Sequence, residues 1–408
     1  MRILLLTHYF EPENGAPQRR WRALIERFVD AGHSVDIVAP PPHYPTGDIE
    51  PDLPAELKAG SHAKGEHGGT VHRVAFLPHN TSIGSRTLDH VWVARATVVA
   101  VMRLVHRGDM HPDVVIATAP GLPTLFAGRV LAKRLKVPLI AEMRDAWPDL
   151  VSHTPGIGRG PASRAKRRVH EFVTRLQRDA ALVVTTTDSF ADVLRARGIS
   201  WVEVVRNGTS LARYASIPPT EHDHDALRVL YIGTVGRSQG LDNVIRASAI
   251  ARARGVNVRT RIVGYGADFK RLQVLNASLG SPVELLGRVE PRQVHSHYMW
   301  ADTAVVSLRD WEPFRWTVPS KLYELMATGK HITAVVDGEA AGIVRQTESG
   351  DVVAPGHPDA LADLWKCLAL DRSLLDTRSG GRTWIAEHAD FDVIAERYRS
   401  VLERVVTR

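Results

Sequence analysis

This 408-residue chain has almost no cysteine and no apolar run long enough to cross a membrane. Its single cysteine, Cys367, excludes an internal disulfide and any metal site built from several thiolates, and the helical pattern around it predicts a packed small side chain. The longest apolar stretch, 91–105, is interrupted by Arg95 and Arg103 and is shorter than the roughly 20 residues that span a bilayer. The apolar run 3–6 is too short for a signal peptide and indicates a first strand. We therefore expect a cytoplasmic protein.

Several familiar sites are missing as well. The loop after the first strand has no Gly-x-Gly-x-x-Gly fingerprint, which disfavours an NAD-dependent enzyme. Neither a Gly-x-x-x-x-Gly-Lys-Ser/Thr phosphate loop nor a His-Glu-x-x-His motif occurs. Asp-x-Asp occurs at 223–225 and 390–392, but neither pair follows a sheet strand, so we predict no metal site. Because no nucleic-acid recognition motif is present, nucleic acid is not an expected partner.

The composition is that of a soluble globular protein, with 44% apolar and 24% charged residues. The length is too great for one typical core and suits two domains of roughly 200 residues each. A net charge of +7 suits an anionic partner or a membrane surface.

Short apolar runs alternate with helical patterns along the chain, and this alternation predicts doubly wound parallel sheets. Because the runs show little polar alternation, both faces of each sheet should be covered by helices. The pattern restarts after a segment with two prolines and a polar run, so we predict an α/β protein of two Rossmann-like domains, with ligands at the carboxyl ends of both sheets. The predicted parts are an N-terminal domain 1–206, a linker 207–226, a C-terminal domain 227–389 and a last helix within 390–408 that packs back onto the first domain. The predicted strands are 2–7, 34–39, 71–75, 114–118, 138–143 and 181–187, then 227–232, 258–263, 283–286, 303–308 and 332–336.

The segment 318–330 carries the strongest functional signal. Ser320 suits a helix N-cap and Gly329 suits its C-terminal end. Lys321 lies in the first turn, where a cation is disfavoured unless an anion binds the free N–H groups there. Glu324, one turn later, suits hydrogen bonds from hydroxyls. The pattern is typical of a nucleotide-sugar site, although an ordinary capped helix with solvated charges would look the same.

The entry of the second half is a strand followed by a glycine-containing loop and a helix. Gly236 allows close backbone approach, and Arg237 offers a planar fork for phosphate oxygens. Gly266 and Arg288 end later strands and are expected to border the same pocket. The alternative for this loop is a tight turn with a solvated arginine. In the nearby segment 310–317, aromatic side chains would pack the loop or stack on a base, Arg315 would reach a phosphate, and Glu312 would bind sugar hydroxyls.

Three features of the first half lie at the carboxyl end of the sheet. His8 follows the first strand, and Gly15 lies in the loop that leads to the first helix. Arg144 and Asp145 follow a buried strand, where charges need partners or a ligand. Arg144 would pair with an anionic group, and Asp145 would accept from a sugar hydroxyl or position an acceptor. The alternative is an internal network of these two charges that supports the loop.

The basic segment 159–178 is predicted to be helical, with an apolar stripe beside its cations. It favours contact with anionic lipid head groups or a lipid pyrophosphate at the inner face of the cell membrane. The alternative is a solvated basic face with a packed stripe. The cations are Arg159, Arg164, Lys166, Arg167, Arg168, Arg175 and Arg178, and the stripe is Val169, Phe172, Val173 and Leu176.

Taken together, these motifs resemble a family 4 retaining glycosyltransferase of the GT-B fold, of the type that acts in bacterial surface-polysaccharide assembly. The resemblance covers nearly the whole chain, and its parts occur in the family's order. They are residues 8–13 with Gly15 and 19–20, then 31–35, 43–47, 144–148, 207–208, 233–236 with 239–241, 263–266, and 319–324 with Gly329.

The resemblance implies sugar transfer from a nucleotide-diphospho-sugar, UDP-sugar by default, without a metal or other cofactor. The acceptor would be a saccharide, a lipid-linked (polyprenyl) saccharide or a small molecule held by the N-terminal domain. Arg237, Lys321 and the helix N-terminus near Ser320 would bind the diphosphate, Glu324 the ribose hydroxyls, and Gly15 would let the first loop close over the phosphates.

The chain also departs from the family pattern. The first of two spaced family glutamates is replaced by Trp316, and Gln239 stands where many relatives have lysine. Arg144 stands where many have histidine. Because no carboxylate is placed as a nucleophile, we expect a front-face displacement in which Arg237 and Lys321 stabilise the departing diphosphate. The alternatives are a sugar-nucleotide epimerase, a phosphorylase, or a non-catalytic nucleotide-sugar-binding subunit.

Overall fold

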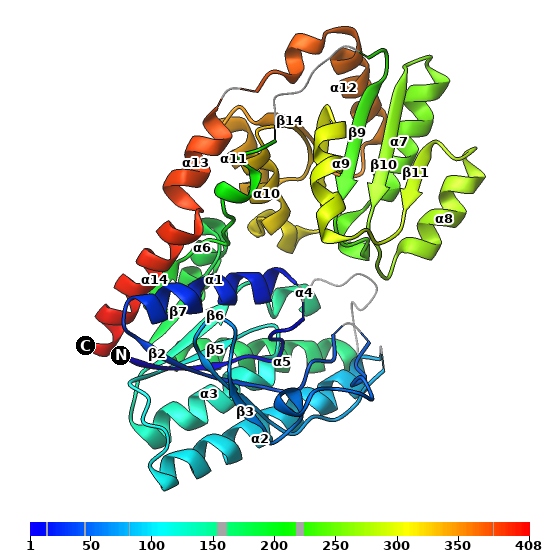
Figure 1. The fold of residues 1–408 in the computed structure, drawn as a ribbon. Helices are drawn as coiled ribbons and strands as arrows, with labels where there is room; N and C mark the ends of the chain where they lie inside the picture. The colour runs from blue at the N-terminus through cyan, green and yellow to red at the C-terminus, as the bar shows by residue number, and fades with distance from the viewer. Residues whose placement is uncertain (14, 45, 81, 153–160, 218–223, 378) are drawn as a thin grey trace. The chain divides into compact units, whose positions relative to one another are not determined.

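The structure is a computed structural model that describes residues 1–408 except 14, 45, 81, 153–160, 218–223 and 378. The chain forms two compact units (Figure 1). Unit 1 comprises residues 1–207 and 391–408, and unit 2 comprises residues 208–390.

Unit 1 contains an eight-stranded sheet in the order β3-β4-β2-β1-β5-β6-β7-β8. Neighbouring strands are parallel except β3, which pairs antiparallel with β4 at one edge. The chain builds outward from β1 through β2 to β4 and then restarts on the other side of β1 with β5, so a topological switch point lies between β1 and β5. The strands are β1 (Arg2–Leu6), β2 (Ser34–Ala39), β3 (His62–Lys64), β4 (Thr70–Arg73), β5 (Val114–Thr118), β6 (Leu139–Met143), β7 (Leu182–Thr185) and β8 (Val202–Val204).

Helices cover this sheet, and their ends follow local rules. α2 begins after Ser82, whose hydroxyl accepts the Ser85 N–H at 3.2 Å, and ends at Gly108 with φ of 82°. The final helix α14 packs against α1 (Figure 1). The ring centroid of its Tyr398 lies 5.8 Å from those of Trp21 and Phe28. The helices are α1 (Ala16–Asp30), η1 (Ala55–Leu57), α2 (Ile83–Arg107), α3 (Leu122–Leu135), α4 (Asp149–Ser152), α5 (Pro161–Arg178), α6 (Asp188–Ala196) and α14 (Phe391–Val406).

Unit 2 contains a six-stranded sheet in which every neighbouring pair is parallel, in the order β11-β10-β9-β12-β13-β14. Its switch point lies between β9 and β12, so the loops that follow these two strands flank the usual ligand position of such a sheet. The strands are β9 (Leu227–Ile232), β10 (Val258–Val263), β11 (Val283–Leu286), β12 (Thr303–Ser307), β13 (His331–Val335) and β14 (Gly350–Val353).

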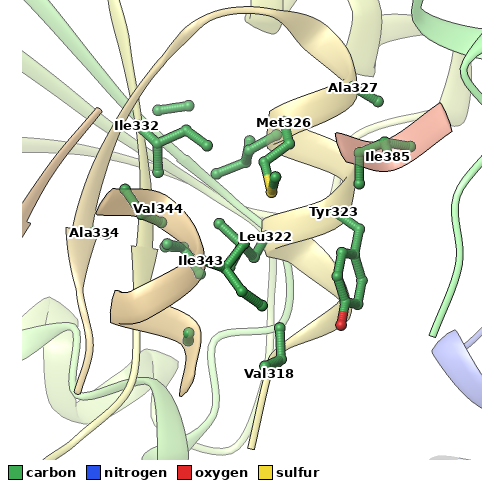
Figure 2. Packing of buried hydrophobic residues seen from close by; sticks show 14 of the residues in the cluster. Val318, Leu322, Tyr323, Met326, Ala327, Ile332, Ala334, Ile343, Val344 and Ile385 are labelled. Atoms are coloured by element: carbon green, nitrogen blue, oxygen red, sulfur yellow. The ribbon is translucent and has the colours of Figure 1, made fainter. Parts of the chain in front are cut away.

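Apolar layers lie on both faces of the unit 2 sheet. On one face α10 is anchored by Leu322, Tyr323 and Met326, which pack among β13 and α11 side chains and against Ile385 of α13 (Figure 2). Tyr323 stacks on Trp384 with centroids 5.8 Å apart. On the other face lie α7 and α12. The helices are η2 (Ala212–Tyr214), η3 (Arg237–Gln239), α7 (Asp242–Ala253), α8 (Phe269–Ser278), η4 (Pro291–Gln293), α9 (Val294–Trp300), η5 (Glu312–Trp316), α10 (Ser320–Thr328), α11 (Gly338–Gln346), α12 (Pro358–Leu370), η6 (Arg372–Leu375) and α13 (Gly380–His388).

Some sequence expectations were wrong or incomplete. Cys367 is exposed on α12 rather than packed. The short strands β3, β8 and β14 were not predicted, because each contains at most two apolar residues. Within the described part of the chain, no helix combines the length and the apolar character needed to cross a bilayer.

Candidate functional site

The carboxyl ends of β9 and β10 interlock through their backbones. Gly264 has φ of +136°, and a Cβ there would lie 1.8 Å from the Gly233 carbonyl oxygen. A Cβ on Gly266 would lie 2.4 Å from the Val235 carbonyl oxygen. The Val235 N–H donates to the Tyr265 carbonyl at 3.2 Å. Only glycine fits at both positions, so the two loops form one continuous backbone surface at the switch point.

The contact between the carboxyl ends of β10 and β11 positions another residue that the sequence singles out, Arg288. The Gly264 N–H donates to the carbonyls of Leu286 and Gly287, each at 3.0 Å. This bond fixes the chain just before Arg288, which is exposed at the same edge of the sheet.

The loop after β9 closes into the one-turn helix η3. The Gly236 N–H donates to Gln239 Oε1 at 3.1 Å, and the Gln239 carbonyl accepts from the Ser307 hydroxyl at 2.6 Å. Gln239 therefore holds the turn through both its side chain and its backbone carbonyl. Arg237, the first residue of the turn, is exposed.

Residues 236–240 also have Gly-x-Ser-x-Gly spacing. The spacing marks a hydrolase nucleophile only if a base activates the serine. Ser238 is exposed in the short helix η3, and no hydrogen bond joins its hydroxyl to a histidine or carboxylate among the described residues. The motif therefore indicates no hydrolase here.

Positive charge gathers around Asp268, just beyond the β10 loop. A hydrogen bond from Arg271 is the main reason why the pKa of Asp268 is lowered, and the charges of Arg237 and Arg309 act in the same direction. Arg309 follows β12, and its N–H donates to the Ser238 carbonyl at 2.9 Å. Arg309 was not identified from the sequence, because nothing around it there marks its contact with the β9 loop.

The helix α10 begins one residue earlier than predicted. Ser320 is its first residue, and Pro319 occupies the N-cap position without a side-chain hydrogen bond. Ser320 is therefore not the N-cap, and the prediction that its hydroxyl caps the helix was wrong. The helix ends at Gly329 with φ of 70°, as expected. The first N–H groups of α10 lack the side-chain acceptor that a capping residue would supply.

Lys321 links α10 to the β9 loop. Its Nζ lies 2.5 Å from Glu324 Oε2 and 3.4 Å from the Tyr298 hydroxyl. Its Cε lies 3.5 Å from where a Cβ on Gly233 would stand. Both charges are largely buried, with 24% and 13% of their side chains exposed. The alternative of a capped helix with solvated charges is therefore disfavoured.

Tyrosines line the same region and were missed from the sequence. The Tyr231 hydroxyl donates to the Thr234 carbonyl at 2.7 Å, and burial raises the pKa of Tyr231 well above its usual value. Burial likewise raises the pKa of Tyr214, with a smaller contribution from the Glu324 charge. These hydroxyls therefore stay protonated beside the Lys321–Glu324 pair.

The segment 310–317 is held by contacts within itself and with the start of α11. Arg315 Nε lies 3.0 Å from Asp337 Oδ2, so this guanidinium has a protein partner. Trp311 packs edge-on against Phe314, with centroids 5.1 Å apart. Glu312 is exposed. The observations favour loop packing over base stacking for Trp311.

In unit 1, Arg144 points into the protein. Its Nη2 donates to the Ala119 carbonyl at 2.9 Å, and its Nε lies 3.2 Å from the Thr118 hydroxyl and 3.9 Å from Glu142 Oε2. Burial lowers the pKa of Arg144, and the charges of Glu142 and Asp145 oppose this shift. Asp145 is half-buried. Arg144 is therefore held inside unit 1, with Thr118, Ala119 and Glu142 as its neighbours in place of the expected partner Asp145, and Asp145 is the more accessible of the two.

His8 and Gly15 occupy the same edge of unit 1. His8 is 2% exposed, and its Nε2 lies 3.0 Å from Asp89 Oδ2. Burial lowers the pKa of the neighbouring His43 to about 4 and that of His90 to about 3. Gly15 is the N-cap of α1 in extended conformation, and a Cβ there would meet Gln18 Oε1 at 2.4 Å.

The predicted basic segment forms α5 from Pro161, and its first member, Arg159, lies outside the described residues. The expected stripe divides in two. Val173 and Leu176 are buried in unit 1, whereas Val169 and Phe172 are 41% and 49% exposed. Phe172 lies 6.2 Å from the exposed Phe126 ring. The helix therefore presents apolar side chains to solvent among its cations.

Two family models match the chain. One, described as a glycosyl transferase 4-like domain, matches residues 15–208. The other, described as glycosyl transferases group 1, matches residues 214–379.

Individual proteins point the same way. The putative colanic acid biosynthesis glycosyl transferase WcaI of Escherichia coli strain K12 is 24% identical over 294 residues, which cover 69% of this chain and 70% of that protein. Sucrose-phosphate synthase from Thermosynechococcus elongatus matches with a TM-score of 0.76 at 18% identity, over 100% of this chain and 99% of that one. Anabaena Alr3699/HepE, solved with UDP and glucose, matches with a TM-score of 0.67 at 18% identity, over 99% and 100% of the two chains. These structures share the GT-B fold of two parallel-sheet α/β domains.

Proposed function

This chain belongs to the GT-B glycosyltransferases that combine a glycosyl transferase 4-like domain with a group 1 domain, and we propose that it is a retaining hexosyltransferase that uses a nucleoside-diphosphate sugar. The observation that carries the proposal is the placement of Lys321. Its ammonium lies at the N-terminal turn of α10, beside the glycine loop that ends β9. Free N–H groups at a helix terminus, a cation and close backbone approach together suit a diphosphate.

Unit 2 is the proposed donor domain. Arg237 and Lys321 bind the diphosphate and stabilise charge on it as it leaves, without a metal at that position. Glu324 binds the ribose hydroxyls, and Gly236, Gly266 and Arg288 line the donor. UDP is the proposed nucleotide, because the Anabaena neighbour was solved with UDP and with UDP-glucose.

Unit 1 is the proposed acceptor domain, with His8 and Asp145 at its polar edge. The relative in colanic acid biosynthesis supports a saccharide acceptor, lipid-linked or free, in cell-envelope polysaccharide assembly. The exposed Phe172 among the α5 cations supports peripheral contact with an anionic membrane.

Calorimetry with UDP, GDP, ADP and TDP tests the donor site. Each charge-assisted hydrogen bond contributes about 1.5–3 kcal/mol, so Arg237→Ala and Lys321→Met should each weaken binding of the preferred diphosphate by roughly 10- to 150-fold. Arg259→Ala is the control, because Arg259 is exposed near the amino end of β10. If both site variants bind the diphosphate as tightly as the parent, Arg237 and Lys321 are not its binding residues. Donor binding without turnover on any lipid or saccharide acceptor would indicate a binding subunit instead.

A further inference from the structure

A group of imidazoles and one carboxylate is buried at the carboxyl edge of the unit 1 sheet. We call it the histidine cluster. It draws on the loops after β1, β2 and β4 and on α2, so it joins four separate segments of the chain. Its members are the buried residues His8, His43, His79 and Asp89, together with the partly buried His90.

We propose that His8, His43 and Asp89 bind a divalent transition metal ion of the zinc type. One ligand atom from each of the three residues can be chosen so that all lie within 4.8 Å of one another. His8 Nε2 and Asp89 Oδ2 are 3.0 Å apart. Two imidazoles and one carboxylate are a recurrent protein ligand set for such ions, with a fourth position left for another ligand.

The outer hydrogen bonds hold two of these ligands in a metal-binding form. His43 Nδ1 lies 2.8 Å from the Pro41 carbonyl, and because a carbonyl can only accept, Nδ1 carries the proton. His43 Nε2 then presents a lone pair, has no hydrogen-bond partner among the described residues, and belongs to a side chain that is 1% exposed. An imidazole that donates its other N–H to a carbonyl is the usual arrangement of a metal ligand.

Asp89 is arranged in the same way. Its Oδ1 accepts the Leu77 N–H at 3.1 Å, whereas Oδ2 faces His8 and has no hydrogen bond of good geometry among the described residues. The Asp89 side chain is fully buried. Burial of this carboxylate among imidazoles carries a large desolvation cost, which a bound cation would offset.

His79 supplies a candidate fourth ligand. Its Nδ1 lies 3.0 Å from the Asn80 carbonyl, which again leaves the lone pair on Nε2. That Nε2 lies 4.0 Å from Asp89 Oδ2, and the side chain is 4% exposed. Three imidazoles with one carboxylate disfavour Mg²⁺ and Ca²⁺, which prefer oxygen ligands.

A metal here would tie together the loops that follow β1, β2 and β4. Its effect would be on the stability and positioning of unit 1, separate from the diphosphate chemistry proposed for unit 2. The site therefore does not rest on the donor assignment.

The test uses the full chain after removal of metal by chelator and dialysis. Zinc should bind with one ion per chain and raise the melting temperature, and Co²⁺ should give the visible absorption of a site with nitrogen ligands. His43→Gln and Asp89→Asn should each weaken zinc binding by more than about 100-fold, since loss of outer-shell partners alone costs about 10- to 100-fold.

Matched controls separate this site from others. His72→Gln should bind zinc like the parent, because His72 pairs with Asp36 at 2.9 Å on the sheet, outside the cluster. A second group, Glu11, Glu66 and His67, is more exposed, and Glu11 is paired with Arg22. Circular dichroism and scanning calorimetry in the absence of metal check that each variant is folded. Stoichiometric zinc binding that survives H43Q and D89N, or that is lost only in H67Q, would overturn the proposal, as would no stoichiometric binding by the folded parent.

Discussion

Replacing Arg20 by methionine should destabilise unit 1 severely. Arg20 lies on α1 and is 2% exposed, and its Nε and Nη2 lie 3.2 and 3.1 Å from Glu142 Oε1 on β6. Its guanidinium also donates to the carbonyls of Val205 and Arg206 after β8. One side chain thus joins a helix, a central strand and the end of the sheet.

The expected loss of stability follows from the contacts that Glu142 retains. In Arg20→Met the fully buried Glu142 keeps Arg144, at 3.9 Å, as its one cationic neighbour among the residues that the structure describes. Removing one partner of a buried pair costs about 3–5 kcal/mol, because a charge is left uncompensated. For a unit of this size, 1 kcal/mol corresponds to about 2–4 °C, so the unit 1 melting temperature should fall by roughly 6–20 °C in scanning calorimetry.

Two further variants make the prediction sharp. Arg20→Met with Glu142→Leu removes both charges and should recover most of the loss, since apolar replacement of a buried pair is often neutral. Arg27→Ala on the same helix breaks an exposed pair with Asp392, whose side chain is 80% exposed, and should cost less than about 1 kcal/mol. The reasoning is refuted if Arg20→Met melts within 2–3 °C of the parent, roughly the shift of a 1 kcal/mol change.

Two more predictions concern the β9–β10 interlock and the membrane. Gly264→Ala should destabilise unit 2 by at least about 3 kcal/mol in urea unfolding and abolish diphosphate binding, because strained φ costs about 1–3 kcal/mol and the Cβ meets a carbonyl at 1.8 Å. Gly255→Ala, with φ of +75° and open space around the Cβ, should cost only about 1–2 kcal/mol; equal effects of the two variants would contradict the interlock. Arg164→Glu combined with Arg168→Glu should reduce the fraction of the protein that sediments with anionic vesicles. The fraction that sediments with neutral vesicles should not change. Adding Phe172→Ser should weaken binding to anionic vesicles further. If none of these variants changes vesicle binding, α5 is only a solvated basic face.

Strands with at least three apolar residues could be predicted from the sequence, and the more polar short strands could not. β2, β5, β9, β10 and β11 lie at their predicted positions. β3, with His62–Lys64, is a polar edge strand whose pairing depends on β4 rather than on its own pattern. Apolar content therefore matters more than position in the sheet for what the local pattern predicts, since β11 is an edge strand as well.

The residues of the candidate site also differ in how far the sequence alone could predict them. Lys321 and Gly236 were identified because helix ends and glycine loops leave local marks. Arg144 was left between two roles, because its bond to Ala119 depends on β5 lying beside β6. The histidine cluster could not be predicted, since His8 and Asp89 are 81 positions apart and no fixed spacing links them.

The Lys321–Glu324 pair allows two opposite expectations for donor binding. If Glu324 served only to neutralise a cation at the α10 N-terminus, an incoming diphosphate would displace it, and Glu324→Gln would tighten binding of UDP. If Glu324 accepts from the ribose hydroxyls, the same change should weaken binding of UDP by about 1.5–3 kcal/mol, roughly 10- to 150-fold, and leave pyrophosphate binding unweakened. We expect the second result, because the carboxylate is already 13% exposed and the nearby Tyr298 hydroxyl remains 3.4 Å from Lys321. Calorimetry with UDP and with pyrophosphate on this one variant distinguishes the two roles, and tighter UDP binding would remove Glu324 from the donor contacts.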